Sequence, residues 1–334
     1  MTTKLAPNPQ TNAKLLLSAL KAVSDETRIR ILHILTFGAF SVNEVVEVLG
    51  MGQSRISRHL KILTEAGLIH NRREGSLVYS FLREPSGKVE GDGSSFFSEL
   101  TDLILSYKED LPFREKDQKM VSIILESREK KSKGFFDRVA KDWEKLQEEI
   151  LHPKVYRSWI LENLPTHLES IVDLGCGPGG LIPYLLPKAK QVLGIDSSSK
   201  MIEAAESTFG KNASVKFLTA QLEALPLAEH STDAIISSMV LHHISHPPAV
   251  LEEASRILKP DGVFCIVDLV KHNQEMMRDN FADLWLGFEP ELLESWLSNS
   301  GFVIESLSEI QTDSIFKILT IKARKKGGHY VHSN

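Results

Sequence analysis

Cysteine is scarce in this chain of 334 residues, which contains only Cys176 and Cys265. Two cysteines cannot form the disulfide framework of a small secreted protein, so we expect two reduced thiols and a cytoplasmic location. Long apolar runs are also missing. No run approaches the ~20 residues that span a bilayer, and no secretory signal opens the chain, so we expect a soluble protein without membrane contact.

An excess of positive charge is missing as well, because the formal net charge is -5. This charge argues against indiscriminate binding of nucleic acid, so any contact with DNA must come from a local basic patch. The length exceeds that of a usual single domain and favours two domains.

The stretch from Ile171 to Gly180 (IVDLGCGPGG) ends an apolar run in a carboxylate that is followed by closely spaced glycines. This pattern predicts a buried strand that turns sharply into a helix. Glycine permits positive φ and lets a ligand lie against bare main chain, while the start of a helix offers free N–H groups. The stretch therefore predicts a nucleotide-like ligand. Its spacing also fits the dinucleotide pattern, so the glycines alone do not decide which adenosine cofactor binds.

Acidic residues at three places narrow this choice. Asp173 precedes the glycines, Asp196 ends the next apolar run, and the segment 223–226 (EALP) follows a third run. This order resembles that of the class I S-adenosylmethionine-dependent methyltransferases, over residues 135 to 270. The resemblance implies that Asp173 lies near the methionine part of the ligand and that Asp196 accepts hydrogen bonds from the ribose hydroxyls. An acid at position 196 also disfavours the 2′-phosphate of NADP, while plain NAD stays open.

Five apolar segments alternate with helical patterns after residue 168, and two further strands are expected at 301–310 and 315–323. This alternation predicts an α/β, Rossmann-like domain with a parallel sheet and ligands beyond the carboxyl ends of its strands. By resemblance, the residues that bind S-adenosylmethionine or S-adenosylhomocysteine are Asp173, Gly175, Cys176, Gly177, Gly179, Asp196, Ser197, Gln221, Leu222 and Ser238. Gln221 departs from the family, which usually has Asp there.

The segment 237–244 resembles the motif that lines the methyl-transfer cavity of that family. His242 within it is a candidate general base, and a histidine that caps the loop is the alternative. Residues 135–143 resemble a helix that closes over the ligand, although a helix that only covers the sheet edge would have the same pattern.

Residues 12–84 predict short helices followed by a basic hairpin, which is the arrangement of a winged helix-turn-helix. In the predicted helix Gln53–Glu65, Ile56, Leu60 and Leu63 recur at core spacing and leave a basic face outside. The predicted DNA-binding residues on this face and in the hairpin are Gln53, Ser54, Arg55, Ser57, Arg58, Lys61, Arg72 and Arg73. A merely solvated basic face is the alternative.

The segments 20–32, 53–63 and 66–69 closely resemble the ArsR/SmtB family of bacterial repressors, over residues 15 to 83. The resemblance implies a homodimer, formed through the N-terminal domain, that places one recognition helix per half-site of double-stranded operator DNA. Many members sense metals through cysteines in the third helix or histidines in the last. Segment 41–49 has no cysteine and segment 96–108 no histidine, so we predict no metal and expect the effector to bind elsewhere in the chain.

The predicted boundaries are a flexible tail at 1–11, the winged helix-turn-helix domain at 12–84 and a flexible loop at 85–95. A dimerisation helix and a connecting helix follow at 96–134, then the class I methyltransferase-like domain at 135–323 and a polar tail at 324–334. The apolar stripe of the dimerisation helix could instead pack on its own domain.

Two functions fit this layout. The first is a DNA-binding transcriptional regulator with S-adenosylmethionine or S-adenosylhomocysteine as effector, since the layout resembles ArsR-type regulators of the methionine cycle that respond to S-adenosylhomocysteine. The second is an active methyltransferase with an attached DNA-binding module. Methyl transfer needs little from a protein beyond alignment of the reactants, so the lack of an evident acceptor motif does not exclude activity.

Overall fold

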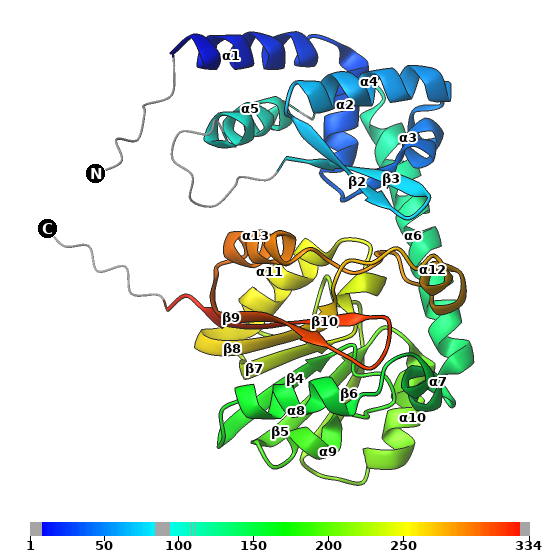
Figure 1. Ribbon diagram of the computed structural model, residues 1–334, viewed down its shortest axis with the longest axis vertical. Coiled ribbons are helices and arrows are strands. Elements are labelled where there is room, and N and C mark those ends of the chain that lie inside the picture. Colours follow the sequence, from blue (N-terminus) through cyan, green and yellow to red (C-terminus); the bar gives the residue numbers. More distant parts are fainter. Residues whose placement is uncertain (1–8, 84–93, 108, 110, 328–334) are drawn as a thin grey trace, which may run out of the picture. The chain divides into compact units, whose positions relative to one another are not determined.

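The structure is a computed structural model that describes residues 9–83, 94–107, 109 and 111–327 (Figure 1). Nearly all of the predicted loop 85–95 and most of the predicted tails 1–11 and 324–334 lie outside these residues. The chain divides into two compact units, residues 1–129 and 130–334, and each is described by itself. The sequence places the start of the second domain a few residues later, at 135.

The first unit is built from helices and one small sheet. Its elements are α1 Pro9–Val23, α2 Glu26–Leu35, β1 Phe40–Ser41, α3 Val42–Leu49, α4 Gln53–Glu65, β2 Ile69–Glu74, β3 Leu77–Leu82, α5 Ser94–Ser106 and α6 Arg114–Val139. The helix α6 extends into the second unit. The sheet is antiparallel in the order β1-β3-β2. These elements confirm the predicted helix-turn-helix with its β-hairpin wing.

The helix-turn-helix begins and turns at the residues that the sequence indicates. Ser41 accepts a hydrogen bond from the Glu44 N–H, while the Glu44 carboxylate accepts one from the Ser41 N–H, which together form a capping box. Gly50 ends α3 in the left-handed region with φ of 64°. The apolar face of α4 lies in the core, where Ile56 and Leu63 are fully buried.

Two ion pairs attach α6 to the rest of the first unit. The Arg30 guanidinium donates to both carboxylate oxygens of Asp117 at 2.7 and 2.8 Å, and both side chains are buried. Arg128 donates in the same forked way to Glu44 at 2.9 and 2.7 Å, so the carboxylate that caps α3 also binds α6. Because each arginine donates two parallel hydrogen bonds to one carboxylate, these pairs fix the orientation of α6 against α2 and α3 as well as its distance from them.

The second unit is a three-layer α/β fold. Its elements in chain order after α6 are α7 Trp143–Ile150, α8 Lys154–Asn163, β4 Leu168–Leu174, α9 Ile182–Leu185, β5 Ala189–Asp196, α10 Ser199–Phe209, β6 Val215–Thr219, β7 Thr232–Ser238, η2 Leu241–His243, α11 Pro247–Ile257, β8 Leu258–Leu269, α12 Met276–Phe281, α13 Pro290–Asn299, β9 Phe302–Gln311 and β10 Lys317–Lys325. Figure 1 shows α11 and α13 on one face of the sheet and α8 and α9 on the other.

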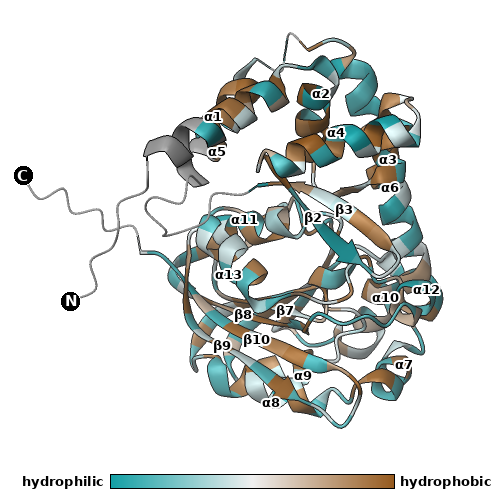
Figure 2. Cartoon of the chain, turned by 45° about the horizontal axis from the view of Figure 1, so that its top comes forward, coloured by the Kyte–Doolittle hydropathy of each residue, from teal (hydrophilic) through white to brown (hydrophobic). Residues whose placement is uncertain are grey.

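The sheet has seven strands in the order β6-β5-β4-β7-β8-β10-β9. The first five run parallel, and β10 is antiparallel to both of its neighbours. Hydrophobic residues run through β8 and β10 (Figure 2), and the segment 263–267 of β8 is almost entirely buried. The predicted Rossmann-like fold is confirmed, with an antiparallel pair added at one edge.

The connecting helix expected within 96–134 is present as part of the longer α6. A helix predicted next to it was wrong. The helix expected at 135–143 does not exist as a unit, because α6 ends at Val139 and α7 begins at Trp143. The basic residues of the predicted hairpin, Arg72 and Arg73, lie within β2, and the hairpin turn is made at Gly75 with φ of 59°. Among the described residues, no helix is both long and apolar enough to cross a bilayer.

We expect Asp117→Ala to lower the free energy of unfolding of the first unit by about 3–5 kcal/mol, because it leaves the buried Arg30 cation without its partner. Hydrogen exchange of the α2 amides measures this loss. Glu65→Ala is the matched control, since it removes only the exposed contact with Lys61 at 3.7 Å and should have little effect. Equal effects of the two substitutions would contradict the structural role of the buried pair.

Candidate functional site

A cavity opens in the second unit where the parallel strands end, and it measures about 850 Å³ with its open mouth included. Most of the predicted cofactor-binding residues line it, namely Asp173, Gly175, Cys176, Gly177, Asp196, Ser197, Leu222 and Ser238. Gly179 and Gln221 do not line it. A Cβ atom at Gly179 would lie 2.9 Å from the Phe209 ring, so this glycine serves the close approach of the loop to α10.

The glycine loop is held by hydrogen bonds to β5. The N–H groups of Gly175 and Cys176 donate to the Ile195 carbonyl at 2.8 and 2.9 Å. The Gly177 N–H donates to the Asp196 carboxylate at 2.9 Å, and the Ser198 N–H donates to its other oxygen at 2.9 Å. Burial raises the pKa of Asp196 to about 6 against the opposing effect of these hydrogen bonds. The carboxylate thus stands in a fixed position at the cavity wall.

Asp173 is the most unusual group in this cavity. It is 2% exposed, and its Oδ2 atom accepts no hydrogen bond from the described residues. Burial first, and then the charge of Asp196, raise the pKa of Asp173 to about 7. A buried carboxylate oxygen without a partner is costly, so this position favours a ligand that brings a positive charge or a hydrogen-bond donor.

Aromatic and charged residues from the helices before the sheet complete the cavity. Phe136 near the end of α6 lies edge-on to Trp143 at 5.3 Å and to His243 at 4.8 Å between ring centroids. Arg157 of α8 lies so close to the loop that a Cβ atom at Gly180 would meet its guanidinium at 2.6 Å. The sequence does not reveal Arg157 as a site residue, because no local motif distinguishes it from other helical arginines.

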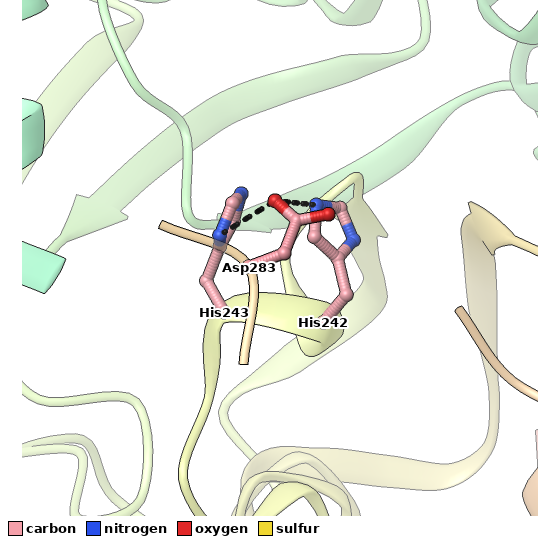
Figure 3. Close-up of side chains that lie close together, drawn as sticks. All are labelled: His242, His243 and Asp283. Carbon is pink, nitrogen blue, oxygen red and sulfur yellow. Dashed lines mark ion pairs between the residues drawn. The ribbon is translucent and has the colours of Figure 1, made fainter. Parts of the chain in front are cut away.

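A second, more apolar cavity of about 430 Å³ shares part of its lining with the first. The residues that line both are Trp143, Gln147, Tyr156, Met239 and His243. His242, the candidate general base, lines only the second cavity. Its Nδ1 atom lies 2.7 Å from Asp268, and its Nε2 atom lies 3.9 Å from Asp283 (Figure 3).

Burial and charge act in opposite directions on these histidines. Burial lowers the pKa of His242, but Asp268 and Asp283 outweigh it and raise that pKa to about 9. Burial and the neighbouring His242 hold the pKa of His243 well below its usual value. Burial raises the pKa of Asp283 to about 7, against the effect of His242.

The candidate DNA-binding face lies on α4 of the first unit. All of the predicted DNA-binding residues on this helix are exposed, namely Gln53, Ser54, Arg55, Ser57, Arg58 and Lys61. Arg73 is exposed in β2, where its Nε atom donates to the Gly75 carbonyl at 2.9 Å. The prediction for Arg72 needs correction, because its side chain is buried and pairs with Glu74 at 2.5 Å. Glu74 lies two positions away on the same face of β2 and neutralises the charge of the Arg72 guanidinium.

Known proteins match both units. Residues 172–266 match the family described as a methyltransferase domain, and residues 25–71 match the bacterial regulatory proteins of the arsR family. A demethylmenaquinone methyltransferase of Thermotoga maritima is 31% identical over 160 residues, which cover 45% of this chain and 67% of that protein. An uncharacterized methyltransferase of Synechocystis sp. is 31% identical over 157 residues, which cover 43% of this chain and 72% of that protein.

The chain belongs to the methyltransferase family. Its first unit carries an arsR-family helix-turn-helix, and the two matches span α2 to β2 and β4 to β8. The fold of the methyltransferase unit is also that of a chain in the complex between the Haloferax volcanii Trm112 methyltransferase activator and a methyltransferase. That chain has a TM-score of 0.50 at 20% identity, with 57% of this chain and 97% of that chain covered.

The chain spans only part of other curated relatives. It is 36% identical over 111 residues to an uncharacterized protein of a Streptomyces fradiae transposon, but it covers 32% of that protein. It covers 52% of an uncharacterized methyltransferase of Schizosaccharomyces pombe. The chain therefore covers about a third to a half of the length of these two relatives.

We expect Asp173→Asn to raise the free energy of unfolding of the ligand-free methyltransferase unit by on the order of 2 kcal/mol at about pH 8. The folded pKa of Asp173 lies above its unfolded value. Its contribution is therefore fully present at about pH 3 and is lost as the pH rises to about 8. Asp173→Asn removes this dependence. All four tryptophans lie in this unit, so their fluorescence reports its thermal unfolding at each pH.

Asp233→Asn is the matched control for this experiment. The Asp233 carboxylate accepts hydrogen bonds from the Glu169 and Ser170 N–H groups and from Lys259, so its loss should lower stability. A wild type and an Asp173→Asn variant with the same pH dependence would show that Asp173 is not under electrostatic strain.

Proposed function

We propose that the chain is a cytoplasmic, DNA-binding transcriptional regulator whose methyltransferase unit binds S-adenosylmethionine or S-adenosylhomocysteine as effector. One observation carries this proposal: a cavity with a buried, unpartnered carboxylate beside a glycine loop occurs in the same chain as an exposed basic recognition helix. The first feature suits an adenosyl amino acid, and the second suits the phosphates and base edges of a DNA duplex.

The cavity residues suit the three parts of such a ligand. Asp173 would accept hydrogen bonds from the ammonium group of the methionine part. These bonds would offset the free energy that the protein loses by burying the Oδ2 atom of Asp173 without a donor. Asp196 would accept hydrogen bonds from the ribose hydroxyls. Arg157 supplies a fork of donors for the methionine carboxylate. The glycine loop keeps bare main chain beside the ligand, and Leu222 offers an apolar surface to the adenine.

The sulfur of the ligand is the part that distinguishes the two candidate effectors. S-adenosylmethionine carries a methyl group and a positive charge that S-adenosylhomocysteine lacks. Residues on the cavity wall near Ser238 and the Phe136–Trp143–His243 aromatic cluster are positioned to sense that difference. A ligand that binds two states of the protein unequally shifts their populations by that difference in affinity.

A homodimer would place two recognition helices on one operator, with half-sites about 34–36 Å apart. Exposed apolar side chains on α1 and α5 support such a dimer, and both helices belong to the first unit. Leu17 on α1 is 56% exposed. Leu103 in the last turn of α5 is 59% exposed, and Tyr107, just after this helix, is 65% exposed. A homodimer that buries these side chains would remove their apolar surface from water.

We expect Leu103→Glu to convert the dimer to a monomer, because a charge on the apolar face would be buried at the interface without a counter-ion. Light scattering after size-exclusion chromatography measures the mass. Val303→Glu is the matched control, since Val303 is 51% exposed on β9 of the other unit and its substitution should leave the mass unchanged. A Leu103→Glu protein with the mass of the wild type would exclude α5 from the interface.

The decisive experiment measures coupling between ligand and DNA. We expect S-adenosylhomocysteine to change the affinity for DNA from the region upstream of the gene by at least about fivefold, and to differ from S-adenosylmethionine in this effect. Reciprocity requires saturating DNA to change ligand affinity by the same factor. Fluorescence anisotropy of labelled DNA measures the DNA affinity with and without ligand, and calorimetry measures the ligand affinity with and without DNA.

Two variants make the result specific. Gly177 has φ of 53°, and a Cβ atom there would contact Trp143 at 3.7 Å inside the cavity, so Gly177→Val should abolish ligand binding and the ligand's effect on DNA. Arg58→Ala should keep ligand affinity but weaken DNA binding. If Arg58 contacts a base, the loss should be ~1–3 kcal/mol and specificity should relax at that base position. If it contacts a phosphate, affinity should fall equally for all DNA sequences and should depend less steeply on salt concentration. Coupling that persists in Gly177→Val would place the effector site elsewhere.

An active methyltransferase is the second candidate, and the second cavity favours it. This cavity shares Trp143, Tyr156 and Met239 with the first, so an apolar acceptor there would lie beside the ligand's methyl group. If neither ligand changes DNA affinity by twofold and DNA leaves both ligand affinities unchanged, the proposal of a ligand-responsive regulator fails. The active methyltransferase then becomes the favoured function.

A further inference from the structure

Three side chains meet at the wall of the second cavity, and among them only His243 also lines the adenosyl cavity. His242 and His243 come from η2, and Asp283 comes from the segment after α12 (Figure 3). One oxygen of Asp283 lies 3.6 Å from Nδ1 of His243 and 3.9 Å from Nε2 of His242. The three residues can offer one ligand atom each within 4.8 Å of one another.

Asp283 lacks the partners that a buried carboxylate requires. It is 1% exposed, and neither of its oxygens accepts a hydrogen bond from the described residues. The nearby Arg278 donates instead to the Leu284 carbonyl at 3.3 Å. Two bare carboxylate oxygens inside an apolar wall are destabilising unless a cation binds them.

His242 is oriented as a metal ligand would be. Its Nδ1 atom is 2.7 Å from Asp268, which also accepts the Leu241 N–H at 3.0 Å and is fully buried. A proton on Nδ1 leaves the lone pair of Nε2 directed toward Asp283. A carboxylate behind a ligating histidine is the usual arrangement at zinc sites, where it fixes the tautomer and the ring orientation.

His243 must rearrange to join the set. Its Nδ1 atom lies 3.3 Å from the Ala282 carbonyl, a weak contact that an ion at this nitrogen would replace. Ligand atoms around a tetrahedral ion with ~2.1 Å bonds lie ~3.4 Å apart. The separations of 3.6 and 3.9 Å from Asp283 are close to this value, and all three ligand atoms lie within 4.8 Å of one another, so the two imidazoles would turn toward the ion on binding.

We propose that His242, His243 and Asp283 bind one divalent transition-metal ion of the zinc type at the wall of the second cavity. Two imidazoles and one carboxylate suit such an ion better than Mg²⁺ or Ca²⁺, which prefer oxygen ligands throughout. Three protein ligands leave a fourth position, and because all three line the cavity, this position would be open to a small ligand with a thiol or hydroxyl group.

This site differs from the metal-sensing positions of the repressor family. Those positions fall in segments 41–49 and 96–108. The first segment has no cysteine and the second has no histidine, whereas the proposed ligands lie in the methyltransferase unit. The competing explanation is a purely structural ion pair, in which a protonated His242 bridges Asp268 and Asp283 without any metal.

The test uses the full chain, stripped of metal with a chelator and titrated with Zn²⁺ alone against a chromophoric competitor. We expect one tight site per chain. Asp268→Asn should weaken it by ~10–100-fold, as at other sites whose supporting carboxylate is removed, and Asp283→Asn by at least as much. Co²⁺ in place of Zn²⁺ should give the visible absorption of a four-coordinate site, which His243→Gln should abolish.

Two controls address adventitious binding and misfolding. His246→Gln changes a histidine of the same loop that is outside the cluster, and a double His329→Gln, His332→Gln variant changes the pair near the C-terminus. Both should bind Zn²⁺ within twofold of the wild type. Circular dichroism of the stripped proteins verifies the fold, and if Asp283→Asn does not fold, His243→Gln decides the question.

The outcome also separates the metal site from the ion pair. At a metal site, Zn²⁺ raises the melting temperature of the wild type and not that of Asp283→Asn. A structural ion pair predicts instead that Asp283→Asn lowers the melting temperature of the stripped protein and that Zn²⁺ affects neither. Zn²⁺ affinity that is unchanged in both Asp283→Asn and His243→Gln would overturn the proposal.

Discussion

The hydrogen bond from the Gly177 N–H to the Asp196 carboxylate joins the turn after β4 to the end of β5, and the site depends on it. It fixes the loop in a conformation with positive φ at Gly175, Gly177 and Gly179, which leaves the main chain uncovered. Asp173 at the end of the adjacent strand β4 is buried, and its Oδ2 atom accepts no hydrogen bond from the described residues. The methyltransferase unit thus holds two carboxylates near each other in an apolar wall, an arrangement that a cationic, hydroxyl-bearing ligand would stabilise.

Local patterns in the sequence predict the parts of the fold that local physics determines. The capping box of Ser41 and Glu44 starts α3, and the apolar spacing of Ile56, Leu60 and Leu63 defines α4 with its observed ends. The acids at the ends of β4 and β5 come together because parallel strands end at one edge of the sheet. These features need only neighbouring residues and the rules of sheet topology.

Contacts between distant segments explain what the sequence does not reveal. Arg157 joins the cavity because α8 folds back over the glycine loop, and Asp283 joins His242 from a segment beyond β8. Arg72 looks like a DNA contact until the strand pairs it with Glu74. The break between α6 and α7 is equally invisible, because the apolar residues on both sides of it keep helical spacing.

Glu44 has two structural tasks, since its carboxylate caps α3 and also binds Arg128 of α6. The two interactions depend on each other. If α6 separates locally from α3, the capping carboxylate of Glu44 loses its ion pair with Arg128. If the cap of α3 opens, Arg128 loses both hydrogen bonds to this carboxylate. The first helix of the helix-turn-helix and the attachment of α6 therefore belong to one cooperative unit, in which local unfolding is a shared event rather than the fraying of separate helices.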